Sequence, residues 1–162
     1  IWNGMTLNEE RETNMNCTQP YVKNAQVVVM KTGSGYTDTA FLADKSVCAE
    51  IGSAGESTIQ DDDNLSKALF VGKPVQTDCL MEVKAGTADA AVLDWTLAKS
   101  MVGEGTDFAD LKMVDGLELA AEEYGIAFRK DSDATAKLNE VMTELIADGT
   151  VQAIIDKYIP AN

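Results

Sequence analysis

The sequence predicts a mixed α/β fold, because short apolar runs alternate along the chain with stretches whose apolar residues recur at helical spacing. Hydrophobic residues make up 45% of the 162 residues, which suffices for a buried core and is too many for a disordered chain. This length fits one domain or two small ones. The sequence contains no uninterrupted apolar run of about 18 residues, so we expect no membrane-spanning helix.

Four strands are expected where apolar, often β-branched residues stand between turn residues. In chain order they cover residues 26–30, 46–50, 90–93 and 124–128. The second strand runs into Gly52-Ser53-Ala54-Gly55, a small-residue turn that opens the polar stretch from Glu56 to Lys67. The third strand ends at Asp94.

Four helices are expected from amphipathic spacing and from the residues at their ends. In chain order they cover residues 78–85, 96–102, 132–148 and 151–158. Thr77 is the expected N-cap of the first helix and Gly86 its C-terminal stop. Ser132 or Asp133 caps the third helix, and Gly149 terminates it.

Charge and composition exclude several classes of function. The 13 basic and 27 acidic residues give a formal net charge of −14, so phosphate backbones and anionic lipid surfaces would repel the chain. The chain has no His, which rules out Ser-His-Asp and Cys-His nucleophiles and any histidine metal site. We therefore expect no nucleic-acid partner.

No motif for a metal, a cofactor or a nucleophile meets its template. Neither Gly33-Ser34-Gly35 nor the turn at residues 52–55 completes a nucleotide-binding loop. The acidic run Asp61-Asp62-Asp63 lacks the glycine and the glutamate of a calcium loop, so a solvated acidic turn is expected there. A GxSxG elbow is also absent. We expect no metal, no cofactor and no enzymatic activity.

The three cysteines are Cys17, Cys48 and Cys79, and their wide spacing matches no metal or redox motif. We expect all three to be free, buried core residues. One disulfide with a leftover thiol is the alternative.

Six short motifs stand in a recognisable order over the whole chain. They are Gly4-Met5-Thr6 with Arg11, Pro20-Tyr21, Val47 with Gly52-Ser53, Asp89-Ala90 with Asp94, Tyr124-Gly125-Ile126, and Asp148-Gly149-Thr150 with Ile154 and Lys157-Tyr158. In this order and spacing the sequence resembles the polar-amino-acid substrate-binding proteins of ABC transporters. These are solute-binding proteins of family 3, with the type II periplasmic-binding-protein fold.

The resemblance implies a site for the two charged groups of an amino acid. Arg11 and Thr6 would bind the α-carboxylate, together with Ser53 and Ala54. Asp94 would accept the α-ammonium group. Without the resemblance, we would expect Arg11 to form a salt bridge on a helix surface and Asp94 to be the N-cap of the helix that follows it.

Further pocket residues also follow from the resemblance. The backbone of Asn3 and Gly4 would form the floor, with Gly52 in the opposite turn. Glu50 lies near the ligand side chain, where a carboxylate favours a cationic amino acid or else points to solvent. Trp2 either covers the pocket or belongs to the core.

The implied architecture is two α/β lobes joined by two hinge strands, with Tyr21, Glu122 and Tyr124 at the hinges. Lobe two covers residues 25–119, and lobe one comprises 1–24 and 120–162. The family's opening segment has no counterpart in the chain, so we expect a piece of a longer protein with an incomplete lobe one. Apolar faces left exposed there, such as that of residues 138–146, predict self-association.

The implied function is extracytoplasmic capture of a polar amino acid and its delivery to an ABC permease by hinge closure. Such a protein is periplasmic, or is a surface lipoprotein in a Gram-positive bacterium. Two alternatives stay open at this point. One is an amino-acid-sensing domain of a receptor, and the other is an enzyme on the same fold, a dehydratase or a transglycosylase-associated domain.

Overall fold

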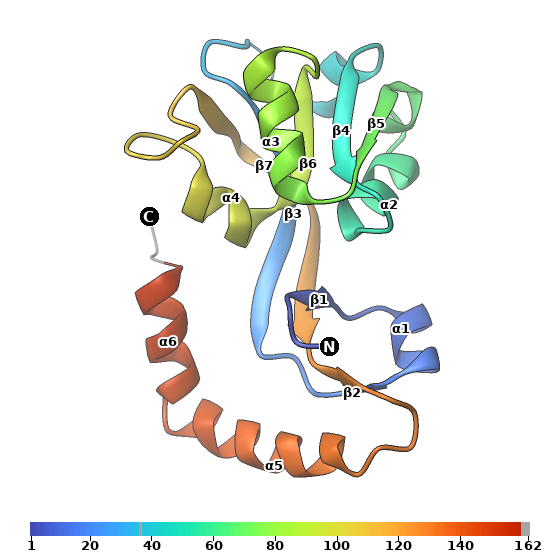
Figure 1. Ribbon diagram of the computed structural model, residues 1–162, viewed down its shortest axis with the longest axis vertical. Coiled ribbons are helices and arrows are strands. Elements are labelled where there is room, and N and C mark those ends of the chain that lie inside the picture. The colour runs from blue at the N-terminus through green and yellow to red at the C-terminus, as the bar shows by residue number, and fades with distance from the viewer. Residues whose placement is uncertain (36, 160–162) are drawn as a thin grey trace. The chain divides into compact units, whose positions relative to one another are not determined.

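The structure is a computed structural model that describes residues 1–35 and 37–159 (Figure 1). It has the mixed α/β fold that the sequence predicts. The chain divides into two compact units: unit 1 comprises residues 1–24 and 122–162, and unit 2 comprises residues 25–121. Unit 2 is thus one continuous segment, whereas unit 1 is assembled from both ends of the sequence.

The sheet of unit 2 has the strand order β7-β3-β6-β4-β5. Its strands are β3 (Val22–Lys31), β4 (Ser46–Glu50), β5 (Leu69–Lys73), β6 (Ala90–Asp94) and β7 (Leu111–Gly125). Strand β4 runs parallel to both of its neighbours, and β3 runs antiparallel to β6. The strands predicted at 26–30, 46–50 and 90–93 are confirmed.

Three α-helices belong to unit 2: α2 (Ala54–Asp61), α3 (Gln76–Ala85) and α4 (Trp95–Met101). Two short 3₁₀-helices, η1 (Thr39–Leu42) and η2 (Leu65–Lys67), complete its connections. Gly86 ends α3 in the left-handed conformation, as predicted. The N-cap predicted at Thr77 is wrong, because α3 begins earlier and Val75 occupies that position.

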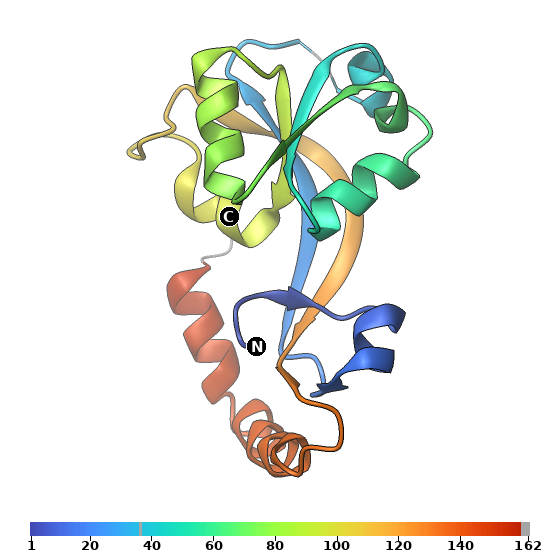
Figure 2. The same ribbon diagram turned by 45° about the vertical axis from the view of Figure 1, so that its right-hand side comes forward.

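Two apolar layers fill unit 2, one on each face of the sheet. Val27 and Val29 of β3 pack in the cluster that includes residues of α3 and α4, whereas Val28 and Met30 pack with residues of α2 and both 3₁₀-helices (Figure 2). Successive strand side chains point to opposite faces, so a run without polar residues predicts a strand covered on both sides. Such a covered sheet is a rigid platform for the loops at its edge.

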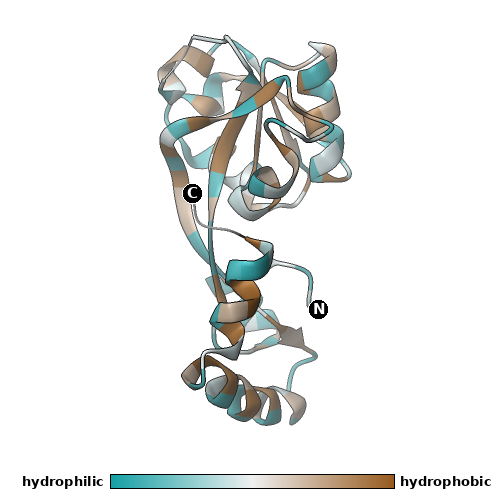
Figure 3. Ribbon diagram, turned by 90° about the vertical axis from the view of Figure 1, so that its left-hand side faces the viewer, coloured by the Kyte–Doolittle hydropathy of each residue, from teal (hydrophilic) through white to brown (hydrophobic). Residues whose placement is uncertain are grey.

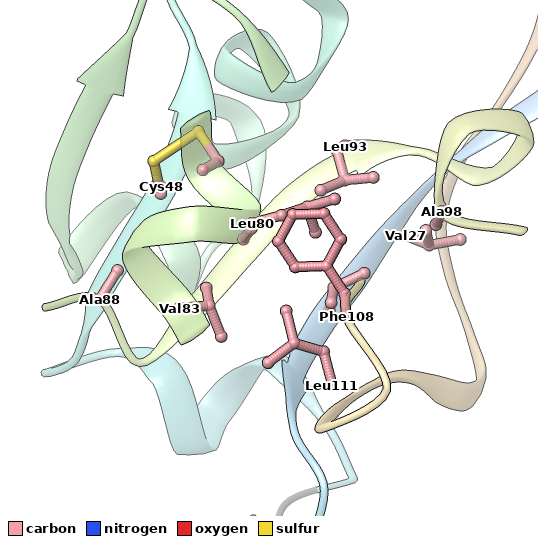
Figure 4. Packing of buried hydrophobic residues seen from close by; sticks show 12 residues of the cluster. Val27, Cys48, Leu80, Val83, Ala88, Leu93, Ala98, Phe108 and Leu111 are labelled. Carbon is pink, nitrogen blue, oxygen red and sulfur yellow. A yellow bond between two sulfur atoms is a disulfide. The ribbon is translucent and has the colours of Figure 1, made fainter. Parts of the chain in front are cut away.

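A disulfide joins Cys48 of β4 to Cys79 of α3, with their Cα atoms 5.4 Å apart (Figure 4). Both residues are fully buried, as predicted for core positions. The prediction that they are free thiols is wrong, because α3 packs across β4 and brings together two residues 31 positions apart. Cys17 is free and half-buried.

Two strands of unit 2 were not expected from the sequence. Strand β5 contains the apolar run Leu69-Phe70-Val71, which was not assigned as a strand, whereas β7 carries acidic residues and Gly116 along its length and forms no apolar run. The strand predicted at 124–128 is in fact two: β7 ends at Gly125, and β8 (Ala127–Phe128) pairs with β2 (Asn16–Cys17).

Unit 1 contains β1 (Met5–Thr6), which pairs with the end of β7, and α1 (Glu9–Asn14). Its C-terminal part forms α5 (Ala134–Ala147) and α6 (Thr150–Tyr158), which confirms the last two predicted helices. The Ser132 hydroxyl accepts a hydrogen bond from the Ala134 N–H group, and Gly149 separates the two helices in a left-handed conformation.

Hydrophilic and hydrophobic residues alternate along helices α5 and α6 (Figure 3). Part of their apolar surface is exposed, with exposed fractions of 49% at Val141, 54% at Ile154 and 67% at Tyr158. Self-association through this surface stays a prediction. Within residues 1–35 and 37–159, every helix is too short or too polar to cross a bilayer.

Candidate functional site

Arg11 lies on α1, immediately after β1. The Asn8 side chain caps this helix by accepting a hydrogen bond from the Arg11 backbone N–H group. The guanidinium Nη1 donates to the Thr6 carbonyl oxygen at 2.7 Å. Within the described part of the chain, no carboxylate lies within 4.0 Å of this guanidinium, so the predicted alternative of a surface salt bridge is not found there. Arg11 is therefore tethered but keeps donors for an anion.

Thr6 belongs to a polar network at the end of β7. Its hydroxyl donates to Glu122 Oε2 at 2.8 Å, and the other carboxylate oxygen of Glu122 accepts from the Asn24 side-chain amide. A hydroxyl has only one hydrogen to donate. While Thr6 donates to Glu122, its oxygen can therefore only accept a hydrogen bond from a ligand.

The remaining pocket residues predicted in unit 1 are Trp2, Asn3 and Gly4. Gly4 has φ +76°, and a Cβ atom added there would lie 3.3 Å from the buried Tyr124 ring. The neighbouring Asn3 is exposed. Trp2 is 65% exposed, so the predicted core role is wrong, and its side chain hydrogen bonds with Tyr21. Burial raises the pKa of the Tyr21 hydroxyl, and the hydrogen bond with Trp2 opposes that shift.

Ser53 is the N-cap of α2 in unit 2. Its hydroxyl accepts from the Glu56 N–H group at 3.2 Å and donates to the Glu50 carbonyl at 2.7 Å. The Glu56 carboxylate in turn accepts from the N–H group of Gly52, the residue before the N-cap, at 2.6 Å. Within the described residues the N–H groups of Ala54 and Gly55 have no acceptor in the chain, so they remain for an anion at this helix terminus.

Asp94 ends β6 and occupies the N-cap position of α4. Its carboxylate accepts from the amide of Gln26 at 2.7 Å and from that of Gln76 at 2.5 Å. Its own backbone N–H group donates to Gln76 Oε1 at 2.9 Å. A Cβ atom at Gly55 would lie 3.0 Å from Gln26 Oε1, so the N-terminus of α2 packs directly against the side chain that holds Asp94.

Glu50 ends β4 and is half-buried. Its pairing partner on β5 is Lys73, but the Lys73 ammonium instead contacts Glu82 Oε1 at 2.5 Å. Hydrogen bonds lower the pKa of Glu82, and the bond from Lys73 has a larger effect than the bond from Thr87. Within the described residues no cation lies within 4.0 Å of the Glu50 carboxylate.

The residues described contain no cluster of acidic or sulfur ligands suited to a metal ion. In the acidic run at residues 61–63, Asp62 accepts hydrogen bonds from the N–H groups of Asn64 and Leu65. This run therefore closes α2 and leads into η2, as a turn does.

Sequence reasoning missed three members of these networks: Gln26, Gln76 and the carboxylate role of Glu122. Gln26 could have been noticed, since it is a polar residue that opens the apolar run at 26–30, and a buried amide needs hydrogen-bond partners. Gln76 gave no signal, because its partner lies 18 residues away on another element.

A family model described as "Bacterial extracellular solute-binding proteins, family 3" matches residues 1–161. The chain is 30% identical to the ABC transporter arginine-binding protein 1 of Escherichia coli strain K12, over 99% of this chain and 65% of that protein. It is 27% identical to a probable histidine-binding protein of Neisseria gonorrhoeae, over 98% of this chain and 59% of that protein.

Solved structures of amino-acid-binding proteins also match the chain. A crystal structure of a mutant ArgBP from T. maritima matches with a TM-score of 0.84 and 33% identity, over 98% of this chain and 67% of that one. The chain thus spans about 59% to 65% of the length of the first curated relatives it matches.

Proposed function

Because the chain belongs to family 3 of the bacterial extracellular solute-binding proteins and has the type II periplasmic-binding-protein fold, we propose that it captures a polar amino acid outside the cytoplasm. The amino acid is then delivered to an ABC permease. We propose binding without catalysis, since the matched relatives are named as binding proteins. In this role the protein is periplasmic or anchored at the cell surface.

The observation that carries the proposal lies within unit 2. There the N-terminus of α2 packs against Gln26, and Gln26 holds the Asp94 carboxylate. One neighbourhood therefore offers N–H donors at Ala54 and an acceptor at Asp94. These are the partners that the carboxylate and ammonium groups of an amino acid require.

Unit 1 supplies the charge that a bound carboxylate needs. Arg11 is held by its bond to the Thr6 carbonyl and has no acidic partner among the described residues. A guanidinium can bind a carboxylate through two parallel hydrogen bonds. We propose that the amino acid binds both units, that it stabilises their closed arrangement by binding it more tightly, and that the strands passing Tyr21, Glu122 and Tyr124 act as hinges.

A cationic amino acid is the favoured ligand, with arginine as the first candidate. The Glu50 carboxylate has no cation within 4.0 Å in the described residues, so it is available to a positively charged side chain. Several relatives are named as arginine-binding, among them that of Escherichia coli and an ancestral protein bound to arginine at 30% identity.

The test is a thermal-melt screen of the chain against the twenty amino acids, ornithine and cystine. A ligand at 100 times its dissociation constant stabilises a binder by about 2.7 kcal/mol. For a chain of this size that corresponds to a rise in melting temperature of about 5–11 °C. We expect the largest rise with arginine.

Two substitutions probe the charged groups, each with a matched control. Arg11→Ala and Asp94→Asn should abolish the rise, because each leaves one charged group of the ligand without its partner. Arg129→Ala and Asp63→Asn remove the same charges from exposed positions and should leave the rise intact. A cooperative melt that no amino acid shifts would refute the proposed function.

A further inference from the structure

We propose that Gln76 is a positioning residue that fixes the Asp94 carboxylate in the orientation needed to accept an α-ammonium group. This inference rests on the function proposed above and deepens it. It assigns a role to a side chain that belongs to neither the carboxylate site nor the hinges.

Gln76 holds Asp94 at two points. Its Nε2 donates to Asp94 Oδ2 at 2.5 Å, and its Oε1 accepts from the Asp94 backbone N–H group at 2.9 Å. A backbone N–H group is only a donor, so the amide oxygen must face it and the amide nitrogen must face the carboxylate. The bond to the Asp94 backbone thus fixes the orientation of the Gln76 amide, and this amide in turn holds the Asp94 carboxylate.

Gln26 completes the arrangement from the neighbouring strand. It is directly opposite Asp94 in the antiparallel pair of β3 and β6, and its Nε2 donates to Oδ1 at 2.7 Å. Each carboxylate oxygen therefore accepts one amide hydrogen. Because both oxygens are held, the directions of the carboxylate's other acceptor positions are fixed as well.

The carboxylate torsion of an aspartate is intrinsically soft, because rotation about its sp³–sp² bond has broad minima. Losing the contact to Oδ2 would remove one of the hydrogen bonds that restrict this rotation. Gln76 is the first residue of α3, and Cys79, three residues later, is cross-linked to β4. The disulfide therefore restrains the helix turn that carries Gln76.

The experiment compares two ligands that differ only in the α-amino group: L-arginine and 5-guanidinopentanoate. Dissociation constants for both are measured by isothermal titration calorimetry on the full chain. Gln76→Met keeps the length of the side chain but removes both hydrogen bonds. We expect arginine affinity to fall about tenfold, in line with a lost hydrogen bond to a charged group, and affinity for the desamino analogue to stay constant.

The control is Gln152→Met on α6, which removes a comparable contact between an amide and a carboxylate, from Gln152 to Asp156 at 2.7 Å. It should change neither constant. If Gln76→Met lowers the melting temperature, Gln76→Asn, with an amide one methylene shorter, should reduce discrimination in the same direction.

Two results would overturn the inference. If Gln76→Met weakens both ligands by the same factor, the residue only supports the fold. If neither dissociation constant changes, Asp94 needs no such positioning. Failure of the unsubstituted chain to bind any amino acid would instead refute the proposed function, and the role of Gln76 with it.

Discussion

Removing the disulfide between Cys48 and Cys79 should destabilise unit 2 by an amount that the structure allows us to estimate. The bond closes a loop across 31 positions. In the chain-entropy treatment such a cross-link restricts the unfolded chain by about 12 cal/mol/K, which is about 3.7 kcal/mol at 25 °C. Both cysteines are fully buried in a packed cluster, so the oxidised and reduced folds share nearly all other contacts.

The assay is urea unfolding followed by Trp95 fluorescence. The chain has two tryptophans, Trp2 in unit 1 and Trp95 in unit 2, so a Trp2→Phe background reports unit 2 alone. Trp95 packs against the cluster that contains the disulfide. The free energy of unfolding is compared between the oxidised chain, the reduced chain and a Cys48→Ala/Cys79→Ala variant.

The reduced chain should lose about 3.7 kcal/mol, and the double variant somewhat more, because its missing sulfur atoms leave a cavity. Cys17→Ala removes the free thiol and should behave like the oxidised parent. Thiol titration in denaturant should find one reactive group before reduction and three after it. A difference below about 1 kcal/mol between the oxidised and reduced chains would refute the reasoning, since the cross-link would then not restrict the unfolded state.

Two further predictions concern single side chains. Gly55→Ala should destabilise unit 2 by about 1–3 kcal/mol, because the added methyl group would lie 2.9 Å from a carbonyl oxygen of β6. The same urea assay measures it, and Gly35→Ala, where nothing lies within 4 Å, is the control. Asp89 should titrate below 3.8, because hydrogen bonds from the Ser46 backbone and hydroxyl lower its pKa. Its contribution to stability is therefore present above the unfolded pKa and is lost as the pH falls through the folded value. Titration followed by NMR should show the pKa of Asp89 rising in Ser46→Ala, and an unchanged value would contradict the assigned cause.

Local patterns in the sequence were sufficient to find most elements of the fold. The runs at 26–30 and 46–50 are apolar because both faces of their strands are covered, and a run of that kind is visible without any knowledge of its partners. Strand β7 was missed because it has no apolar run. Its exposed positions carry charges, and its buried ones, such as Leu111 and Val114, are too far apart to form a run.

The candidate site could be predicted only in part, because some of its contacts join residues that are far apart in the sequence. Arg11 and Asp94 were singled out by the order of short motifs along the chain. The groups that hold Asp94 come from β3 and from the start of α3, and no spacing rule connects them to it. The alternative of one disulfide with a leftover thiol is the one found, but its pairing could not be chosen from the sequence, because only the packing of α3 on β4 brings Cys48 and Cys79 together.

The hydrogen bond from Gly52 to Glu56 at the start of α2 has a consequence for the kind of anion that could bind there. A helix N-terminus carries about half a positive charge and by itself attracts phosphate as readily as a carboxylate. Here the Glu56 carboxylate already sits 2.6 Å from the Gly52 nitrogen and offsets much of that charge. A doubly charged anion would meet electrostatic repulsion from Glu56 and from a protein of net charge −14, whereas a zwitterion brings its own positive charge. We therefore expect inorganic phosphate to bind at this turn more weakly than the amino acid proposed as its ligand.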